Sequence, residues 1–166
     1  MIWEVAVIFI LMALDFPFTV APATVWGLSL GLDVVYLGLL YVISTICSAL
    51  VCYFALRKQA KRFKTWKIIG RYKAKGAFYS VFVANMLAHI FDTAAASGYY
   101  KLNLFTTMLA LTASNIIYFI ILLAMVALLM LLSNVLAIQI IVSMIVVAFA
   151  WTVTAHSIMY KLGFGW

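Results

Sequence analysis

Charged residues are scarce in this chain, and acidic residues are the scarcest. Only 9% of its 166 residues are charged, and Asp and Glu together number four. A soluble domain carries about a quarter charged residues, so the composition excludes a soluble globular fold. With 69% hydrophobic residues, the whole chain, residues 1–166, is expected to form a single all-α membrane domain with no room for a separate soluble module.

The sequence also lacks the motifs of soluble catalytic sites. The two cysteines, Cys47 and Cys52, lie in an apolar run at a spacing that suits neither a metal site nor a redox motif, so buried packing is expected. There is no glycine-rich phosphate loop and no serine-centred elbow, and no Ser or Cys is placed to act as a nucleophile with His89 as its base. We therefore expect no enzymatic activity, no catalytic residues, no bound metal and no cofactor.

Positive charge, in contrast, is concentrated in one stretch. Nine of the eleven basic residues lie between Arg57 and Lys75, and the flanking sequence on both sides is almost entirely apolar. Lys and Arg are retained on the cytoplasmic side of membrane proteins, so residues 57–75 are predicted to be a cytoplasmic loop of a multi-pass cell-membrane protein. Nucleic acid is not an expected partner, because cations beside membrane segments attract anionic lipid headgroups, by about 1 kcal/mol each.

Three apolar segments are long enough to cross a membrane, which takes about 20 residues. Val34–Leu56 ends at the basic stretch and is predicted to run from outside to inside, and Val135–Tyr160 is predicted to be the last span. Leu102–Leu132 is longer than the hydrocarbon core requires. It is expected to be tilted, or broken near three polar residues: Thr112, Ser114 and Asn115.

Two other segments are expected to be discontinuous. Met1–Leu14 is short for a span and leads into residues 16–31, where Pro17 and Pro22 each remove a backbone donor and disfavour helix before them. We interpret this region as a short or tilted helix followed by a re-entrant or broken element. Such backbone survives at membrane depth only when it is buried in protein or lines a wet cavity.

Residues 76–98 form the second discontinuous segment. They are long enough to span a membrane but carry Asn85, His89 and Asp92. If the segment crosses, Lys101 and Lys161 end up outside. If it enters and returns, both lie inside with the other basic residues, and the charge bias favours this second topology.

The two halves of the chain share a pattern. In each half, a polar, interrupted element precedes a glycine, Gly31 or Gly98, and then a long span with Ser and Thr in its middle. An odd number of crossings between the halves would make them an inverted repeat, the arrangement by which many transporters build a site at mid-membrane. The expected parts are a first half (1–56), the basic loop (57–75), a second half (76–132) and a C-terminal transmembrane helix (133–166).

The basic stretch has an apolar periodicity of its own. Phe63, Trp66 and Ile69 recur every three residues, which suits a helix lying in the membrane interface with its aromatic residues towards the lipid. A solvated loop that only sets the topology explains the stretch equally well. If it binds anionic lipid, the candidate contacts are four cations: Lys61, Arg62, Lys64 and Arg71.

A few polar residues inside the apolar segments are candidates for a proton or substrate site: Asp15, Asn85, His89, Asp92 and Asn115. Asn85, His89 and Asp92 are spaced so that one helix would place them on one face, and acids at membrane depth usually face a cavity or a partner. The simpler alternative is that Asp92 ends a short helix at the surface. Asp15 could cap a helix or titrate, and Asn115 could hydrogen-bond to a neighbouring helix.

A family pattern can be compared with these residues. The first half has an acid, two prolines and two glycines in order: Asp15, Pro17, Pro22, Gly27 and Gly31. The second half has Gly76, Ser97-Gly98 and Phe105. Over roughly residues 15–130 this arrangement resembles the DedA superfamily, which includes VTT-domain proteins and small multidrug-export proteins. The chain departs from the family at its arginines, because Asn85 stands near the place of the first and Asp92 near the place of the second.

The resemblance implies two re-entrant elements that face each other at mid-membrane and move lipid headgroups, polyprenyl-phosphate or phospholipid, often with coupling to protons. The expected function is therefore lipid translocation, with Asp15 and Asp92 as the ionisable pair. An exporter of small solutes or cations is the first alternative, and a non-transporting membrane scaffold with a lipid-binding basic loop is the second. Lipids with anionic headgroups are the expected partners, and a homo-oligomer is compatible with the sequence.

Overall fold

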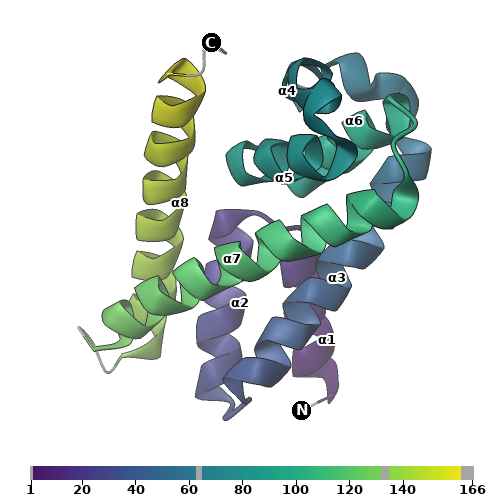
Figure 1. Cartoon of the computed structure of the whole chain (residues 1–166). Helices are drawn as coiled ribbons and strands as arrows, with labels where there is room; N and C mark the ends of the chain where they lie inside the picture. The colour runs from purple at the N-terminus through teal and green to yellow at the C-terminus, as the bar shows by residue number, and fades with distance from the viewer. Residues whose placement is uncertain (1, 63–64, 132–134, 162–166) are drawn as a thin grey trace. The chain divides into compact units, whose positions relative to one another are not determined.

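Every element in the part of the chain that the structure describes is helical, as the sequence predicts. The computed structural model describes residues 2–62, 65–131 and 135–161 (Figure 1). The elements are α1 (Ile2–Ala13), α2 (Pro17–Ser29), α3 (Val34–Ala55), the 3-10 helix η1 (Arg57–Arg62), α4 (Thr65–Tyr72), the 3-10 helix η2 (Lys73–Lys75), α5 (Ala77–Leu87), α6 (Ile90–Tyr99), α7 (Leu104–Met130) and α8 (Leu136–Lys161).

Among the described residues, three helices are long and apolar enough to cross a membrane: Val34–Ala55 in α3, Leu104–Leu128 in α7 and Ile138–Ile158 in α8. Their mean hydropathies are 2.2, 2.3 and 2.1, and no more than 39% of any of these stretches is buried inside the protein. Helices this apolar with so much uncovered surface are suited to contact with lipid. The first and last predicted spans are confirmed to within one residue at each end.

The middle span, α7, is continuous, so the predicted break near Thr112, Ser114 and Asn115 is wrong. The Ser114 hydroxyl donates to the carbonyl oxygens of Ala110 and Leu111, at 3.0 and 2.9 Å. Its hydrogen-bonding need is therefore met inside the helix, which tolerates such a bond without breaking. With 27 residues, α7 is about 40 Å long, whereas the hydrocarbon core is about 30 Å thick, so a tilt is still expected.

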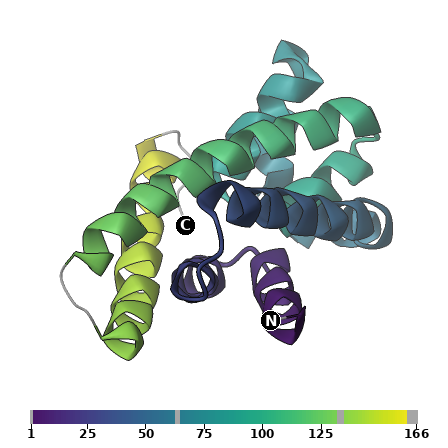
Figure 2. The ribbon, with the colours of Figure 1, turned by 90° about the horizontal axis from the view of Figure 1, so that it is seen from below.

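The chain changes direction between α1 and α2 at Asp15 and Phe16. Asp15 has a φ of 52° and Phe16 is extended, with φ −89° and ψ 141°, so the helix cannot continue. Pro17 then begins α2, where its missing N–H leaves no intrahelical bond unmade. Pro22 lies inside α2 without ending it, which corrects the expectation that this proline breaks the element. Figures 1 and 2 both show α1 beside α2, against which it packs.

A second break separates α5 from α6. Ala88 (φ −145°, ψ −167°) and His89 (φ −85°, ψ 146°) are both extended. The two helices have 11 and 10 residues, and a spanning helix needs about 20. Residues 76–98 therefore form two short helices and not one continuous spanning helix.

The order of elements is repeated along the chain. A short helix, an extended break, a second short helix, a turn and a long helix follow one another in α1–α2–α3 and again in α5–α6–α7. The residue that precedes the second short helix has nearly the same backbone angles in both copies, at Phe16 and at His89. The two predicted halves of the chain are thus alike in the order of their elements and at this break.

The turns that lead into the two long helices have the same hydrogen bonds. After α2, Leu32 N–H donates to Gly27 O at 3.0 Å, and after α6, Leu102 N–H donates to Ser97 O at 3.1 Å. This is the bond of a Schellman motif, which places a residue with positive φ just before its donor. That residue is Gly31 (φ 78°) in the first copy and Lys101 (φ 52°) in the second.

Each long helix is then capped by the side chain that precedes it. Asp33 Oδ1 accepts a hydrogen bond from Val35 N–H at 2.7 Å, and Asn103 Oδ1 accepts one from Thr106 N–H at 3.0 Å. Asp and Asn are among the best capping residues because a short side chain reaches the free N–H groups of the first turn. The turn and the cap together make the likeness of the two copies specific.

Packing divides the chain into two compact units with separate cores. The first unit comprises residues 1–45 and 116–154, and its core brings α1 and α2 together with Tyr41 and Phe119. The second unit comprises residues 46–115 and 155–166. It has one apolar cluster that includes Ala94 and Leu111, and another that includes Ile68 and Ile69.

Candidate functional site

The first unit holds Asp15 beside a group of buried aromatic side chains. The hydroxyl of Tyr41, a residue of α3 that is fully buried, donates a hydrogen bond to Asp15 Oδ1 at 2.5 Å. The Tyr41 ring stacks on Phe119, with ring centres 5.3 Å apart, and lies 6.1 Å from the ring of Tyr118. Tyr118 in turn meets Trp151 edge to face at 4.9 Å. An acid at a helix break is thus held by a phenol from a membrane-spanning helix.

Asp15 is not the N-cap residue of α2. That position belongs to Phe16, whose side chain makes no capping hydrogen bond. The positive φ of Asp15 is a conformation that few residues adopt, although Asp adopts it more readily than most. The backbone therefore directs the carboxylate towards Tyr41, as the hydrogen bond between the two side chains records.

In the second unit, Asn85 and Asn115 come together. Asn85 Nδ2 donates to Asn115 Oδ1 at 2.8 Å and to Ser114 Oγ at 2.7 Å. All three side chains are buried, and the bonds join α5 to α7. Asn85 Oδ1 is also buried, and it accepts no hydrogen bond from any described residue. A buried acceptor without a donor costs about 1–3 kcal/mol, so this oxygen is available to a ligand or a water molecule.

Two further buried hydroxyl groups lie in the second unit. Thr93 on α6 and Thr107 on α7 are fully buried, and their Oγ1 atoms make no hydrogen bond within the described residues. Together with Asn85 they are three of the buried polar groups of this unit whose bonding capacity is not filled within the described residues, and the Thr65 hydroxyl is another. Nothing in the sequence marks Thr107, because an isolated Thr inside an apolar span carries no pattern of its own.

His89 and Asp92 lie at the start of α6 and not on a common helix face with Asn85. The predicted single face needs an unbroken helix, and the break at Ala88 and His89 removes it. His89 is the N-cap residue, with its ring 4.9 Å from that of Phe91. Asp92 is in the first turn of α6, where a negative charge is favoured by the helix dipole. Burial nevertheless raises the pKa of the Asp92 carboxyl to about 6.

Asp15 and Asp92 belong to different compact units. Each acid has its own surroundings: Tyr41 for Asp15, and the start of α6 for Asp92. The expectation that the two acids share a pocket stays a prediction. Within the described ranges, no three His, Cys, Asp or Glu residues are grouped closely enough to hold a metal ion.

The basic stretch is not the single interface helix that its periodicity suggested. It forms η1, α4 and η2, and Ile68 and Ile69 of α4 are fully buried in a cluster with residues of α5 and α6. Trp66 stacks on Tyr100, with ring centres 6.2 Å apart, and its carbonyl accepts a hydrogen bond from the Tyr100 hydroxyl at 3.3 Å. The apolar side of α4 thus packs on protein, because α5 and α6 cover it.

Of the four cations predicted to contact lipid, the structure describes the side chains of two, Lys61 and Arg71. Lys61 lies over the ring of Tyr99, at 5.6 Å from its centre. Arg71 is exposed at the end of α4. Lys64, Phe63 and the side chain of Arg62 lie outside the described residues.

Both ends of residues 76–98 lie beside the basic stretch. The segment begins directly after η2, and α4 packs on both α5 and α6. At its other end, Lys73 Nζ lies 5.1 Å from the centre of the Tyr100 ring, and Lys101 lines a pocket with Arg57, Lys58 and Lys61. The chain that leaves the basic stretch at Gly76 therefore comes back to it.

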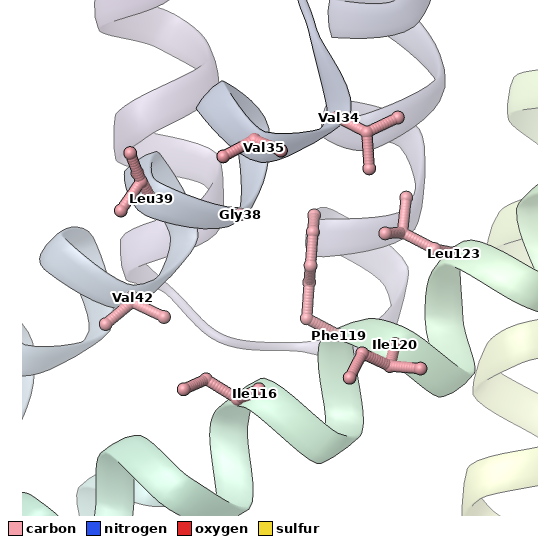
Figure 3. A pocket seen from close by; sticks show the side chains of 9 residues that line it. All are labelled: Val34, Val35, Gly38, Leu39, Val42, Ile116, Phe119, Ile120 and Leu123. Carbon is pink, nitrogen blue, oxygen red and sulfur yellow. The ribbon is translucent and has the colours of Figure 1, made fainter.

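An apolar groove in the first unit was not foreseen from the sequence. It lies between the first half of α3 and the second half of α7 and has a volume of about 330 Å³ (Figure 3). Its lining is entirely apolar: Val34, Val35, Gly38, Leu39, Val42, Ile116, Phe119, Ile120 and Leu123. A Cβ atom on Gly38 would lie 3.2 Å from the Phe119 ring, so the missing side chain is part of what shapes the groove. A hydrocarbon chain is the kind of group such a lining can hold.

Comparison with known proteins gives no match for this chain, whether with family models, with curated proteins or with solved structures. The resemblance to the DedA superfamily therefore rests on the residues quoted above. What the structure adds is the repeated order of elements and the polar groups at the two breaks.

Proposed function

We propose that this chain translocates lipid headgroups across a cell membrane in the manner that its resemblance to the DedA superfamily implies. The observation that carries the proposal is the repeat of two short helices followed by a long one, with matching turns and caps. Transporters that build their sites from discontinuous helices use pairs of this kind, because the interrupted backbone and its polar neighbours come to lie near mid-membrane. Each copy here has a polar side chain at or beside its break.

In this proposal, α1–α2 and α5–α6 are re-entrant pairs. None of the four helices is long enough to span, since the longest has 13 residues, and the end of α6 returns to the basic stretch from which α5 departs. If neither pair crosses, α3 is the one crossing between the copies. A single crossing gives the copies opposite orientations, which is an inverted repeat. The positive-inside rule then places residues 57–75 in the cytoplasm.

The polar groups have complementary capacities for a headgroup. In the first unit, the Asp15–Tyr41 pair offers a carboxylate that can bind a cationic group or exchange a proton. In the second, Asn85 Oδ1 and the hydroxyl groups of Thr93 and Thr107 are available for hydrogen bonds. Neither unit offers an arginine at its break, so the headgroup is recognised through hydrogen bonds and carboxylates rather than by an intramembrane cation.

The test is lipid translocation by the purified full chain in vesicles that contain a fluorescent phospholipid in the inner leaflet. We expect transfer to the outer leaflet, and we expect Asp15→Asn to reduce the rate at least about tenfold because the carboxylate is lost. Asp33→Asn is the matched control. It makes the same chemical change at an exposed acid, and Asn keeps the helix cap, so its rate should be that of the unchanged protein.

Three results would contradict the proposal. Release of a trapped solute or cation without movement of lipid would make the chain an exporter. If neither lipid nor solute moves, the remaining alternative is a membrane scaffold that transports nothing. Equal rates for Asp15→Asn and Asp33→Asn would show that lipid moves without the acid at the first break.

A further inference from the structure

A basic pocket in the second unit joins the start of the basic stretch to the end of the re-entrant pair. It has a volume of about 530 Å³ and is lined by Arg57, Lys58, Lys61, Gly98, Tyr99 and Lys101. Four of these six residues are cations, and none is an acid. The volume falls within the range of about 300–1,000 Å³ that is usual for small-molecule sites.

The close approach of two elements creates this pocket. η1 packs on α6, and Gly98 is the residue that permits it. A Cβ atom at Gly98 would lie 2.2 Å from the carbonyl oxygen of Tyr53, near the end of α3, and 3.3 Å from Cβ of Arg57, at the start of η1. Any larger residue would push α6 away from the end of α3 and the start of η1. The cations of η1 and the end of α6 therefore share one cavity because this position has no side chain.

Lys101 adopts a backbone conformation that a lysine does not favour. Its φ is 52°, in the left-handed region that costs free energy for residues with a side chain. The corresponding residue of the first copy is Gly31, which adopts the same region without that cost. Residues in this conformation persist where the surrounding structure holds them, and they are enriched at functional sites. The second copy thus has a cation at the position where the first copy has the residue that the turn prefers.

Four cations line this one pocket. No carboxylate lines the pocket, and the chain has four acids in all. Of these, Asp92 lies in the first turn of α6, at the opposite end of that helix from Tyr99. Like charges in one cavity repel each other unless a ligand of opposite charge enters. Arg and Lys together are the usual partners of phosphate, Arg through paired hydrogen bonds and Lys as a point charge.

We propose that this pocket, formed by Arg57, Lys58, Lys61 and Lys101 around Tyr99, binds the phosphate group of an anionic headgroup. Four positive charges suit a phosphate monoester, which carries about two negative charges near neutral pH, better than a phosphodiester with one. The pocket is separate from the polar groups at the two helix breaks. It relies on the proposed function only for the membrane location of the chain, and its occupant is held, not translocated, at this place.

The experiment measures binding and not transport. The full chain in detergent is titrated with a short-chain phosphatidic acid, with phosphatidylcholine of the same chain length, and with inorganic phosphate. We expect saturable binding of phosphatidic acid and none of phosphatidylcholine. Inorganic phosphate that displaces the lipid at similar concentration would assign recognition to the phosphate alone. Weaker displacement would assign the rest of the affinity to the lipid, and both results support a phosphate pocket.

Three variants distinguish binding in this pocket from nonspecific attraction of the lipid to the basic residues. Lys101→Gly should weaken phosphatidic acid about fivefold, the effect of one cation near a headgroup, and should leave the thermal midpoint unchanged or higher because the strained backbone is relieved. Arg57→Gln should weaken it at least as much. Lys67→Gln, which removes an exposed cation of α4 that does not line the pocket, should have a smaller effect than either.

Equal weakening by all three variants would overturn the inference, because it would show attraction without a site. So would equal binding of phosphatidic acid and phosphatidylcholine. If phosphatidic acid binds in a Lys101-dependent way but the chain translocates no lipid, the proposed function is wrong and the phosphate pocket stands. Translocation that persists while phosphatidic acid fails to bind would remove this inference alone.

Discussion

The hydrogen bond between Tyr41 and Asp15 gives the sharpest test of how the first unit is organised. Tyr41→Phe removes one oxygen atom and keeps the ring, which is fully buried and stacks on Phe119 with ring centres 5.3 Å apart. The variant therefore changes polarity with little change in packing. Asp15 Oδ1 loses the donor that lies 2.5 Å away, and the carboxylate is left with fewer bonds at a helix break.

Two magnitudes bound the cost of this change. Hydrogen bonds to charged groups contribute about 1.5–3 kcal/mol in water-soluble proteins. Side-chain bonds between membrane helices contribute less, about 0.6 kcal/mol on average and up to about 1.7, because the unfolded helices in the membrane also find partners. The acceptor here is a carboxylate in a buried aromatic setting, so we expect the loss to lie at the upper end of the membrane range, about 1–2 kcal/mol.

The assay is unfolding of the full chain in mixed micelles, with a double-mutant cycle over Tyr41→Phe and Asp15→Asn. A direct bond predicts that the two changes are not additive, with a coupling energy of at least about 0.5 kcal/mol. Tyr36→Phe is the matched control, since Tyr36 is on the same helix but 44% exposed. Additive changes in the cycle, or a Tyr41→Phe cost no larger than that of Tyr36→Phe, would refute the bond and with it the role of α3 in holding the first acid.

Two further predictions concern the second unit. Gly98→Ala should destabilise the protein by about 1–3 kcal/mol, as overpacking does, because the new Cβ would lie 2.2 Å from the Tyr53 carbonyl oxygen. Gly27→Ala is the control in the same unfolding assay. It should cost less, because its Cβ would meet only the movable end of the Leu37 side chain. The Asp92 carboxyl, whose pKa is raised from 3.8 to about 6, holds its proton more tightly in the folded state, so stability should fall as the pH rises from about 3.8 through about 6. Asp92→Asn should flatten that part of the profile in thermal unfolding measured across the pH range, and an unchanged slope would contradict the burial of this acid.

The sequence located what depends on length and on apolar composition. The spans of α3 and α8 were predicted closely because no Asp, Glu, Arg or Pro interrupts either run and a basic residue follows each predicted span. These are local properties, and a single sequence contains them. The sequence paired Gly31 with Gly98 in the two halves, but the residue that matches Gly31 at the turn is Lys101, so that pairing is corrected.

Properties that depend on partners far along the chain were not predicted. The sequence left a break in α7 open beside a tilt, but the helix is continuous, and Ser114 bonds to its own helix and to Asn85 of α5. It also indicated that Asn85, His89 and Asp92 share a face, whereas the helix ends at Leu87 with neither Pro nor Gly to mark the place. The partner of Asp15 is Tyr41, on the next long helix, and no spacing rule joins the two. Side chains that meet only after folding decide these cases.

The two copies differ at one position of the turn before the long helix, where the first copy has Gly31 and the second has Lys101. Both turns make the same Schellman bond and both are followed by an Asp or Asn cap, so the backbone requirement is the same. A glycine at position 31 meets it without strain, and space is open around it. A lysine at position 101 meets it at a cost in free energy and adds its charge to a cavity with three other cations. The turn accounts for the backbone of both residues. In the proposal above, the charge of Lys101 has a further use, because it contributes to binding a phosphate group.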